Sequence, residues 1–328
     1  MAERKFRDER GAALLTVLLL VAIVAVIAAG ALEKLRLSTR IAGNAGTTEQ
    51  LRGYALAAEA LALSRIEALQ SASATRTTLA SDWSGRPFSL PLPGGGVATA
   101  RVVDGGNCFN LNGLVTQVSP GVYQSAALQR LVFTRLMRLT GTPPQVADQV
   151  AAAAADWIDT DQDSQASGAE DQTYLSRDPS YRTAGTLMVD PSELRALNGV
   201  TPEVYAALRP WVCTLPVAQP AAINVNTLAP EQAPLLSMLL ADTLPVETAR
   251  RVLLSRPAQE FSSTTAFWTQ PALASLQVGD TSQTAVKSAW FALSVDVRLG
   301  SASLEEHALI DATRLPPRLA TRQWGERS

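Results

Sequence analysis

Residues 11–32 read GAALLTVLLLVAIVAVIAAGAL, an uncharged apolar run in which the Thr16 hydroxyl is the one polar side-chain group. About 20 such residues, each rising about 1.5 Å in a helix, cross a hydrocarbon core of roughly 30 Å. A short leader rich in charges, Met1–Arg10, precedes the run. The run therefore predicts a membrane-spanning helix near the N-terminus.

Three kinds of membrane segment begin in this way. A removable secretory signal needs an apolar stretch of about 7–15 residues and a cleavage site of small residues. Ala28-Ala29-Gly30 offers such a site, but the run is too long for this kind. A signal anchor is never cut, whereas the third kind is cut at the cytoplasmic face after Gly11 and leaves Ala12 as the N-terminus of an intact helix. The junction Arg10-Gly11-Ala12-Ala13 resembles the class III signal of type IV pilins and type II secretion pseudopilins, and this resemblance favours the third interpretation.

Two cysteines bear on the location of the remaining chain. Cys108 and Cys213 are the only cysteines, and exported domains pair two cysteines more often than not, whereas cytosolic proteins keep them reduced. A bridge would close a loop of about 100 residues, which stabilises a fold by roughly 4–5 kcal/mol in the chain-entropy model. Two buried free thiols are the alternative. Basic residues on both sides of the apolar run make the positive-inside rule only a slight guide to orientation.

The composition excludes some classes of protein. The chain has 328 residues and a formal net charge of −2. About 290 residues remain beyond the apolar run, enough for two or three compact units. No run is strongly basic, so nucleic acid is not expected as a partner. Leucine- and alanine-rich stretches place much of the chain in helices, which excludes an all-β secreted domain.

An amphipathic helix follows the apolar run. Apolar residues recur at helical spacing at Leu51, Tyr54, Ala58, Leu61, Ala62, Ile66 and Leu69. Between them lie the charged residues Arg52, Glu59, Arg65 and Glu67. One long helix is therefore predicted to leave the membrane and pack its apolar stripe on a globular head. Gly43 and Gly46 are expected to loosen it, since each glycine costs about 1 kcal/mol relative to alanine in a helix.

Two distant segments predict β-hairpins. Residues 87–106, PFSLPLPGGGVATARVVDGG, read as two short strands around a glycine turn. Residues 289–312, AWFALSVDVRLGSASLEEHALIDA, alternate apolar and polar side chains on each side of Gly300-Ser301. A one-sided sheet made from both hairpins would pack on the long helix. The predicted fold class is therefore α+β, with everything between the hairpins helical and inserted into the head.

The predicted insertion has two helical parts, from about Val122 to Val212 and from about Ile223 to Val278. Pro143-Pro144 and Thr201-Pro202 suit helix N-termini, where the missing proline N–H costs nothing. The second part is similar to a helix-hairpin-helix or SAM-like unit. Such hairpins bind DNA phosphates through glycine-rich turns. Its turn, ADTLPVE, has no glycine pair, and Arg250 and Arg251 are the only adjacent basic residues, so a protein-packing role is favoured.

The strongest polar cluster is DWIDTDQDSQASGAEDQTY, residues 156–174. Asp159, Asp161, Asp163 and Glu170 fall at positions 1, 3, 5 and 12 of a calcium-loop pattern. Ser164 occupies the sixth position, where an EF-hand needs glycine, and no clear helix follows Glu170. We expect a calcium loop that is not an EF-hand, because carboxylates so close together need a cation and the cluster offers zinc no histidine or thiolate. A solvated acidic loop that caps the preceding helix is the alternative.

A catalytic interpretation of these carboxylates is weaker. A glycosidase places two carboxylates across a cleft, whereas these crowd one loop. His307, the one histidine, follows Glu305-Glu306 in the predicted C-terminal hairpin, and we expect it to be an exposed strand residue rather than a base. Neither a G-x-S-x-G elbow nor a phosphate-binding glycine loop occurs. The chain is therefore not expected to be an enzyme.

Together these features resemble the type II secretion system minor pseudopilin K (GspK) family over nearly the whole chain. The resemblance rests on RGAALLTVLLLVAIV, GGNCFNLNGL, AADWIDTDQDSQASGAEDQTYL, SELRALNGV and INVNTL. It implies a type IV pilin-like fold, with a long N-terminal transmembrane helix on a small antiparallel sheet and a large all-helical insertion. It also implies processing after Gly11 by prepilin peptidase, an inner-membrane anchor and a periplasmic globular domain. The implied partners are minor pseudopilins I and J at the pseudopilus tip, and the major pseudopilin.

The resemblance divides the chain into six segments. These are a leader (1–11), a transmembrane helix (12–33), the helix and first strands of the head (34–114), an inserted helical domain with the calcium loop (115–215), a second SAM-like part (216–282), and the C-terminal strands and tail (283–328). The resemblance implies calcium, as more than one ion. The implied ligands are Asp159, Asp161, Asp163, Glu170 and Asp171, with Asn198 as a further oxygen donor.

Pilins and pseudopilins usually have glutamate at the fifth mature position, where this chain has Thr16. A carboxylate in lipid is costly unless it is paired, and in major subunits the new α-amine of a neighbour can pair with it. A subunit that enters first has no earlier neighbour, so an uncharged Thr16 favours a position at the tip. Two other functions share part of the pattern: a minor pilin of a type IV pilus, and a membrane-anchored periplasmic calcium-binding hydrolase.

Overall fold

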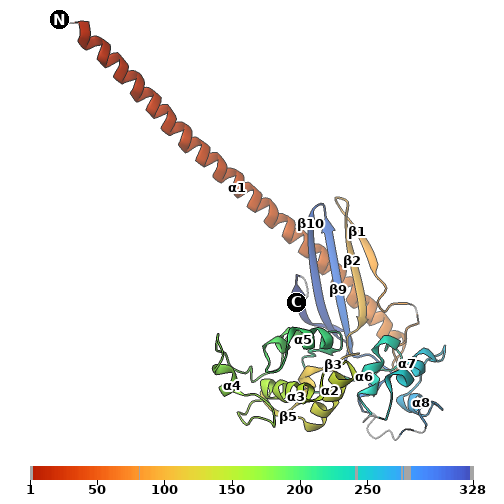
Figure 1. The fold of residues 1–328 in the computed structure, drawn as a ribbon. Helices are drawn as coiled ribbons and strands as arrows, with labels where there is room; N and C mark the ends of the chain where they lie inside the picture. The colour runs from red at the N-terminus through yellow and green to blue at the C-terminus, as the bar shows by residue number, and fades with distance from the viewer. Residues whose placement is uncertain (1–2, 81, 241–242, 275, 277–281, 326–328) are drawn as a thin grey trace.

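The computed structural model describes residues 3–80, 82–240, 243–274, 276 and 282–325. A single long helix, α1 (Glu3–Ala72), projects from a globular part that contains the remaining elements (Figure 1). α1 is continuous through Gly43 and Gly46, so neither glycine interrupts it. Its side chains are exposed from residue 11 to residue 46 and become partly or fully buried only beyond that point.

A five-stranded antiparallel sheet covers the C-terminal part of α1 (Figure 1). The strands are β1 (Phe88–Leu92), β2 (Gly96–Asp104), β9 (Trp290–Leu299), β10 (Ala302–Asp311) and β11 (Arg318–Trp324), in the spatial order β1-β2-β9-β10-β11. Both predicted hairpins are confirmed, and the pairing of β2 with β9 joins them. β11 adds an edge strand beyond the second hairpin.

The first core lies between α1 and this sheet. Buried alanines on α1, at positions 55, 58 and 62, let the helix approach Ala98 and Ala100 of β2 and the valines of β9 closely. Leu51 and Ile66 are buried in the same layer, as the helical spacing predicts. Glu59 departs from the amphipathic pattern, because its side chain is buried in this interface rather than exposed. It is ion-paired there with Arg322 of β11.

The inserted region holds the other helices. These are α2 (Ala127–Leu139), α3 (Pro144–Ile158), α4 (Asp171–Leu175), α5 (Pro202–Leu208), α6 (Ala233–Ser237), α7 (Val246–Leu254) and α8 (Thr264–Trp268), with short 3-10 turns η1 (Leu111–Leu114), η2 (Pro191–Ala196) and η3 (Pro230–Gln232). Pro144 and Pro202 occupy first turns, as predicted. The Thr201 hydroxyl caps α5 by accepting a hydrogen bond from the Val204 N–H at 3.3 Å.

The expectation that this region is entirely helical is wrong. β4 (Val115–Ser119) and β5 (Val122–Ser125) form a hairpin, so Val122 begins a strand and not a helix. Two parallel bridges of two residues each join β3 (Phe109–Asn110) to β6 (Val212–Cys213) and β7 (Ile223–Asn224) to β8 (Thr284–Ala285). Strands this short carry no periodicity that a sequence pattern can detect. The predicted end of the second part, Val278, lies outside the described residues.

Two Asn-x-Asn motifs, Asn110-Leu111-Asn112 and Asn224-Val225-Asn226, make the same set of hydrogen bonds, one at each inserted part. Asn110 and Asn224 each accept a hydrogen bond from the backbone N–H two residues later. The amide of Asn112 then pairs with both the N–H and the C=O of Met188, at 2.7 and 2.9 Å. Asn226 pairs with the N–H and C=O of Phe261 at 2.8 and 2.9 Å. Because both amides are buried and satisfied, each motif fixes a distant loop without an unpaired polar group.

A disulfide joins Cys108 to Cys213, which confirms the predicted pairing. The two Cα atoms lie 5.8 Å apart, beside the parallel bridge of β3 with β6. The disulfide therefore brackets the first inserted part, at the point where the chain leaves the sheet and returns towards it.

Candidate metal centre

The acidic cluster begins in the last turn of α3. Asp156 and Asp159 are three residues apart, so their side chains lie on the same side of the helix end. Both are buried, with Asp156 in the helix and Asp159 at its C-cap. Buried carboxylates without partners are costly, so their contacts determine what the cluster can do.

Asp156 organises the loop that follows α3. Its carboxylate accepts hydrogen bonds from the N–H groups of Gln165 and Ala169, at 3.2 and 2.8 Å, and from the Ser164 hydroxyl at 3.3 Å. A Cβ atom added to Gly168 would lie 1.9 Å from Asp156 Oδ2, so only glycine lets the loop close this tightly. The loop therefore turns back on α3 and brings Glu170 next to Asp159.

Asp156, Asp159 and Glu170 converge on one point. One carboxylate oxygen from each residue lies within 4.8 Å of the corresponding oxygens of the other two. Both oxygens of Asp159 and both of Glu170 are buried without a hydrogen-bond partner. Four unpaired carboxylate oxygens in a buried site need either protons or a cation.

The electrostatics of the cluster agree with this requirement. Burial and the neighbouring charges of Asp161 and Asp156 raise the pKa of Asp159 to about 7. Burial and the surrounding carboxylates, Asp156 first among them, raise the pKa of Glu170 to about 8. A cation would favour the ionised form of both carboxyl groups, because it replaces their mutual repulsion with attraction to the cation.

The other predicted ligands are arranged differently. Asp161 and Asp163 are exposed, and Asp161 Oδ1 accepts a hydrogen bond from the Asp163 N–H at 2.9 Å. Asp171 accepts hydrogen bonds from the Thr183 N–H at 2.9 Å and from the Arg182 guanidinium at 2.6 Å, which hold its pKa below the ordinary value. The Asn198 side-chain oxygen accepts a hydrogen bond from Arg177 at 2.8 Å. Asp171 and Asn198 therefore do not join the buried group in this structure.

Two features of this region differ from the sequence-based prediction. Asp156 belongs to the buried group, and its i, i+3 spacing from Asp159 at the end of a helix is the signal that would have indicated it. A one-turn helix, α4, follows Glu170, contrary to expectation. Five residues are too short to produce a recognisable helical pattern.

The donor set fits calcium. Carboxylate oxygens are the ligands that calcium prefers, and neither histidine nor cysteine occurs in this group. In the structure, Asp159 and Glu170 are the residues whose free oxygens would hold the ion. Asp156 contributes charge while its carboxylate holds the loop.

His307 is not the exposed strand residue that we expected. Its side chain is 19% exposed, and its Nε2 lies 3.7 Å from Glu305 Oε2 on β10. It lines a cavity of about 200 Å³ between the sheet and the first inserted part. The sequence could not indicate this burial, because the residues that cover His307 come from η2, β6 and the segments around them.

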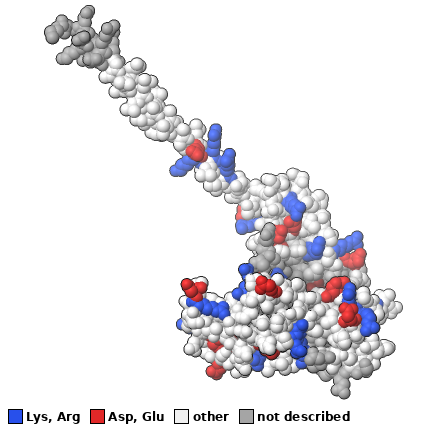
Figure 2. Space-filling view, in the orientation of Figure 1, with Lys and Arg blue, Asp and Glu red and all other residues white. Residues whose placement is uncertain are grey.

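A second candidate surface is the exposed half of α1. Beyond its grey N-terminal end, Figure 2 shows this half first without charged side chains and then with a collar of them. In the sequence, residues 11–32 carry no charge, and Glu33, Lys34, Arg36 and Arg40 follow. The apolar window before the collar is long enough to cross a membrane, and none of it is buried in the protein. It therefore has the length, composition and exposure of a membrane anchor.

Comparisons with known proteins agree along the chain. Two family models, both described as "Type II secretion system (T2SS), protein K", match residues 107–217 and 223–287. Type II secretion system protein K of Klebsiella pneumoniae is 36% identical over 313 residues, covering 92% of each chain. The protein of the same name from Pectobacterium carotovorum subsp. carotovorum is 32% identical over 324 residues, covering 97% of each.

A solved structure has the same fold over most of its length. The crystal structure of the GspK-GspI-GspJ complex from the type 2 secretion system of enterotoxigenic Escherichia coli contains a chain that matches with a TM-score of 0.74 and 28% sequence identity. The match covers 85% of this chain and 96% of that one. The apolar helix, the acidic cluster and these matches lead to one conclusion: the chain belongs to the type II secretion system protein K family.

Proposed function

We propose that this chain is a minor pseudopilin of a type II secretion system, a structural subunit without enzymatic activity that assembles with minor pseudopilins I and J. The observation that carries the proposal is the exposed apolar half of α1, which leaves the globular part without covering any of it (Figure 1). A helix of this kind needs lipid or other helices around it. The relative of known structure, which is in a complex with GspI and GspJ, supports those partners.

The proposal includes the membrane and the processing of the N-terminus. The apolar window would lie in the inner membrane, with the globular part and its disulfide in the periplasm, because disulfides persist in oxidising compartments. Prepilin peptidase would cut after Gly11 and leave Ala12 at the N-terminus of the helix. The freed helix would then pack with the helices of partner subunits, the major pseudopilin among them. Thr16, whose hydroxyl donates to the Ala13 carbonyl at 2.8 Å, brings no charge into lipid.

Calcium would stabilise the inserted part. Asp159 and Glu170, with no other partners for their oxygens, would hold an ion and keep the loop of residues 159–170 closed on α3. The site lies far along the chain from α1, within the core formed by the inserted parts. Its role would be structural, because the carboxylates crowd one site and do not face each other across a cleft.

Co-purification tests the partner assignment. The full chain, tagged at its C-terminus, is expressed with minor pseudopilins I and J and extracted from the membrane in detergent. We expect I and J to elute with the chain in one complex. The control replaces Leu18 and Leu20, whose side chains are exposed outside the globular part, by aspartate, and it should not be recovered with I and J from the membrane. Elution of the unsubstituted chain without I and J would contradict the proposal.

A further inference from the structure

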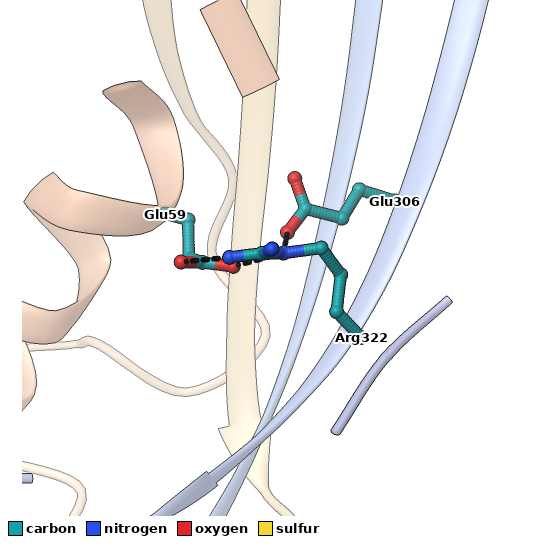
Figure 3. Close-up of polar contacts among 3 residues, drawn as sticks. All are labelled: Glu59, Glu306 and Arg322. Atoms are coloured by element: carbon teal, nitrogen blue, oxygen red, sulfur yellow. Dashed lines mark hydrogen bonds and ion pairs between the residues drawn. The ribbon is translucent and has the colours of Figure 1, made fainter. Parts of the chain in front are cut away.

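An ionic group with two buried carboxylates and a partly exposed arginine lies where β11 meets α1. Glu59 of α1 and Glu306 of β10 are 6% and 0% exposed, and both face Arg322 of β11 (Figure 3). Arg322 Nε and Nη2 each lie 2.8 Å from an oxygen of Glu59, so this pair is bidentate. Arg322 Nε also lies 3.2 Å from Glu306 Oε1. Glu306 Oε2 is buried without a hydrogen-bond partner.

The charges of this group do not balance. Two carboxylates and one guanidinium leave one negative charge in excess when all three are ionised. Because the bidentate bonds go to Glu59, Glu306 is the carboxylate left with the weaker partner. A buried excess charge is costly, whereas one proton on the carboxylate pair neutralises the group.

The elements packed around this group carry other charged or titratable residues. On α1, Arg52 and Tyr54 lie on the earlier part of the same helix; the Arg52 guanidinium is 5.9 Å from the Trp324 ring centre, and the Tyr54 hydroxyl accepts a hydrogen bond from Gln50. On β10, Glu305 and His307 point to the opposite face, as side chains alternate along a strand. On β9, Val295 is paired with Glu306, while Asp296 and Arg298 lie on the opposite face and pair with each other. The balance therefore depends on the two buried carboxylates, Glu59 and Glu306, and on Arg322, whose side chain is 30% exposed.

β11 has contacts on both of its faces. Among the described residues it is an edge strand paired with β10, and Arg322 ties it to α1. On its other face, Gln323 Nε2 donates to Asp190 Oδ2 at 3.3 Å, and Asp190 caps η2 of the first inserted part. β11 therefore links the long helix on one side to the inserted region on the other.

We propose that Glu59, Glu306 and Arg322 form a proton-dependent clamp, which holds the C-terminal strand β11 against α1 while the two carboxyl groups share one proton and loosens β11 when that proton leaves. The clamp goes beyond the proposed assembly role, because it makes the joint between the head and the inserted region respond to pH. It requires neither calcium nor a partner subunit.

The direction of the response follows from the two carboxyl groups. Burial, with Glu59 adding its charge, raises the pKa of Glu306 from 4.5 to about 7. Burial alone would raise the pKa of Glu59 as well, but its hydrogen bonds to Arg322 bring it below the ordinary value. When β11 opens, Glu306 regains contact with water and its ordinary pKa. The closed form therefore binds more protons between about pH 4.5 and 7, and opening rises with pH across that window and is level above it.

Hydrogen exchange on the full chain tests the clamp. The protein is kept in detergent with saturating calcium, and exchange of residues 318–324 is followed by mass spectrometry from pH 5 to pH 8, corrected for the intrinsic pH dependence of amide exchange. We expect the opening of β11 to increase about tenfold per pH unit between pH 5 and 7 and then to level off. The central strand β9 should show no matching change.

Two matched variants identify the group responsible. Glu306→Gln keeps a hydrogen-bond acceptor without a titrating charge, so β11 should open to the same extent at all these pH values. Glu305→Gln, next to it on the opposite face, should keep the dependence of the unsubstituted chain. Opening that stays constant from pH 5 to 8 in the unsubstituted chain would overturn the clamp. So would an unchanged dependence in Glu306→Gln, or a loss of protection in β9 by the same factor.

Discussion

At the residue scale, the members of the acidic cluster differ in whether their carboxylate oxygens have hydrogen-bond partners. Asp156 uses its oxygens to hold the loop, whereas Asp159 and Glu170 have none of theirs bonded. A ligand that satisfied these four oxygens would remove a penalty of several kcal/mol, since each unpaired buried polar group costs about 1–3 kcal/mol. The calcium assignment therefore rests on particular atoms and not on the count of acidic residues.

Removing two of these carboxylates should abolish stabilisation by calcium. In the unsubstituted chain, calcium at about 100 times its dissociation constant should add about 2.7 kcal/mol, seen as a higher melting temperature. The double variant Asp159→Asn, Glu170→Gln keeps the size of both side chains, so it should fold and show no calcium-dependent shift. Thermal melts with calcium and with chelator measure the difference.

A matched control uses the same helix. Asp148 is exposed on α3 and outside the cluster, so Asp148→Asn should keep the full calcium shift. The assignment fails if the double variant still gains stability from calcium, or if the unsubstituted chain gains none.

The uncharged side chain of Thr16 leads to a separate prediction about assembly. Its side chain bonds to the helix backbone and needs no partner from another subunit. A carboxylate at this position would need a neighbour's amine in lipid. Thr16→Glu should therefore change the number of pseudopili per cell, counted by electron microscopy, with Thr16→Ser as the control. Equal number and length in Thr16→Glu and the unsubstituted chain would contradict a tip role for this residue.

At the scale of elements, the sequence predicts those with a long, regular pattern. The alternation of apolar and polar side chains in residues 291–298 predicts β9. The helical spacing of apolar residues from Leu51 to Leu69 predicts the buried face of α1. It does not predict β3, β6, β7 and β8, because strands of two residues depend on backbone pairing between distant segments. Nor does it predict the burial of Glu59, whose partner Arg322 lies 263 residues further along the chain.

In the candidate site, too, sequence spacing predicts one part, and contacts between distant residues determine the rest. The spacing of Asp159 and Glu170 predicts that both belong to one acidic loop, and the structure brings the two carboxylates together. Calcium binding by this loop stays a prediction. Which carboxylates face inward depends on the turn at Gly168 and on bonds from Arg182 and Arg177, which draw Asp171 and Asn198 away. Those contacts are tertiary, so spacing alone cannot order them.

The disulfide should contribute a large part of the stability of the inserted region. It closes a loop with a sequence separation of 105 residues, so the chain-entropy model gives roughly 4–5 kcal/mol. Replacing Cys108 and Cys213 by serine should lower the free energy of unfolding by about 2–5 kcal/mol in urea titrations without reductant. With reductant, the unsubstituted chain should unfold like the variant. Equal stability of the oxidised protein and the variant would contradict this account.

At the scale of the whole molecule, the two larger hydrophobic cores lie in different parts of the protein. The sheet and the C-terminal part of α1 form one core, and the two inserted parts share another that contains the acidic cluster. The apolar half of α1 belongs to neither (Figure 2). A molecule with an uncovered helix at one end and the inserted region at the other is suited to be held by its helix, and we propose that the bulk of the inserted region blocks the addition of further subunits.

We propose that this helix is cut by a peptidase and then assembles with other helices, and that it is neither an uncut anchor nor a removable signal. Mass spectrometry of the full chain, purified from membranes that contain prepilin peptidase, distinguishes the three. We predict a mature protein that begins at Ala12, and a shift to the full-length mass when Gly11→Val blocks the cut. A chain that retains Met1–Gly11 in the presence of the peptidase, or one that begins after Gly30, would contradict the account.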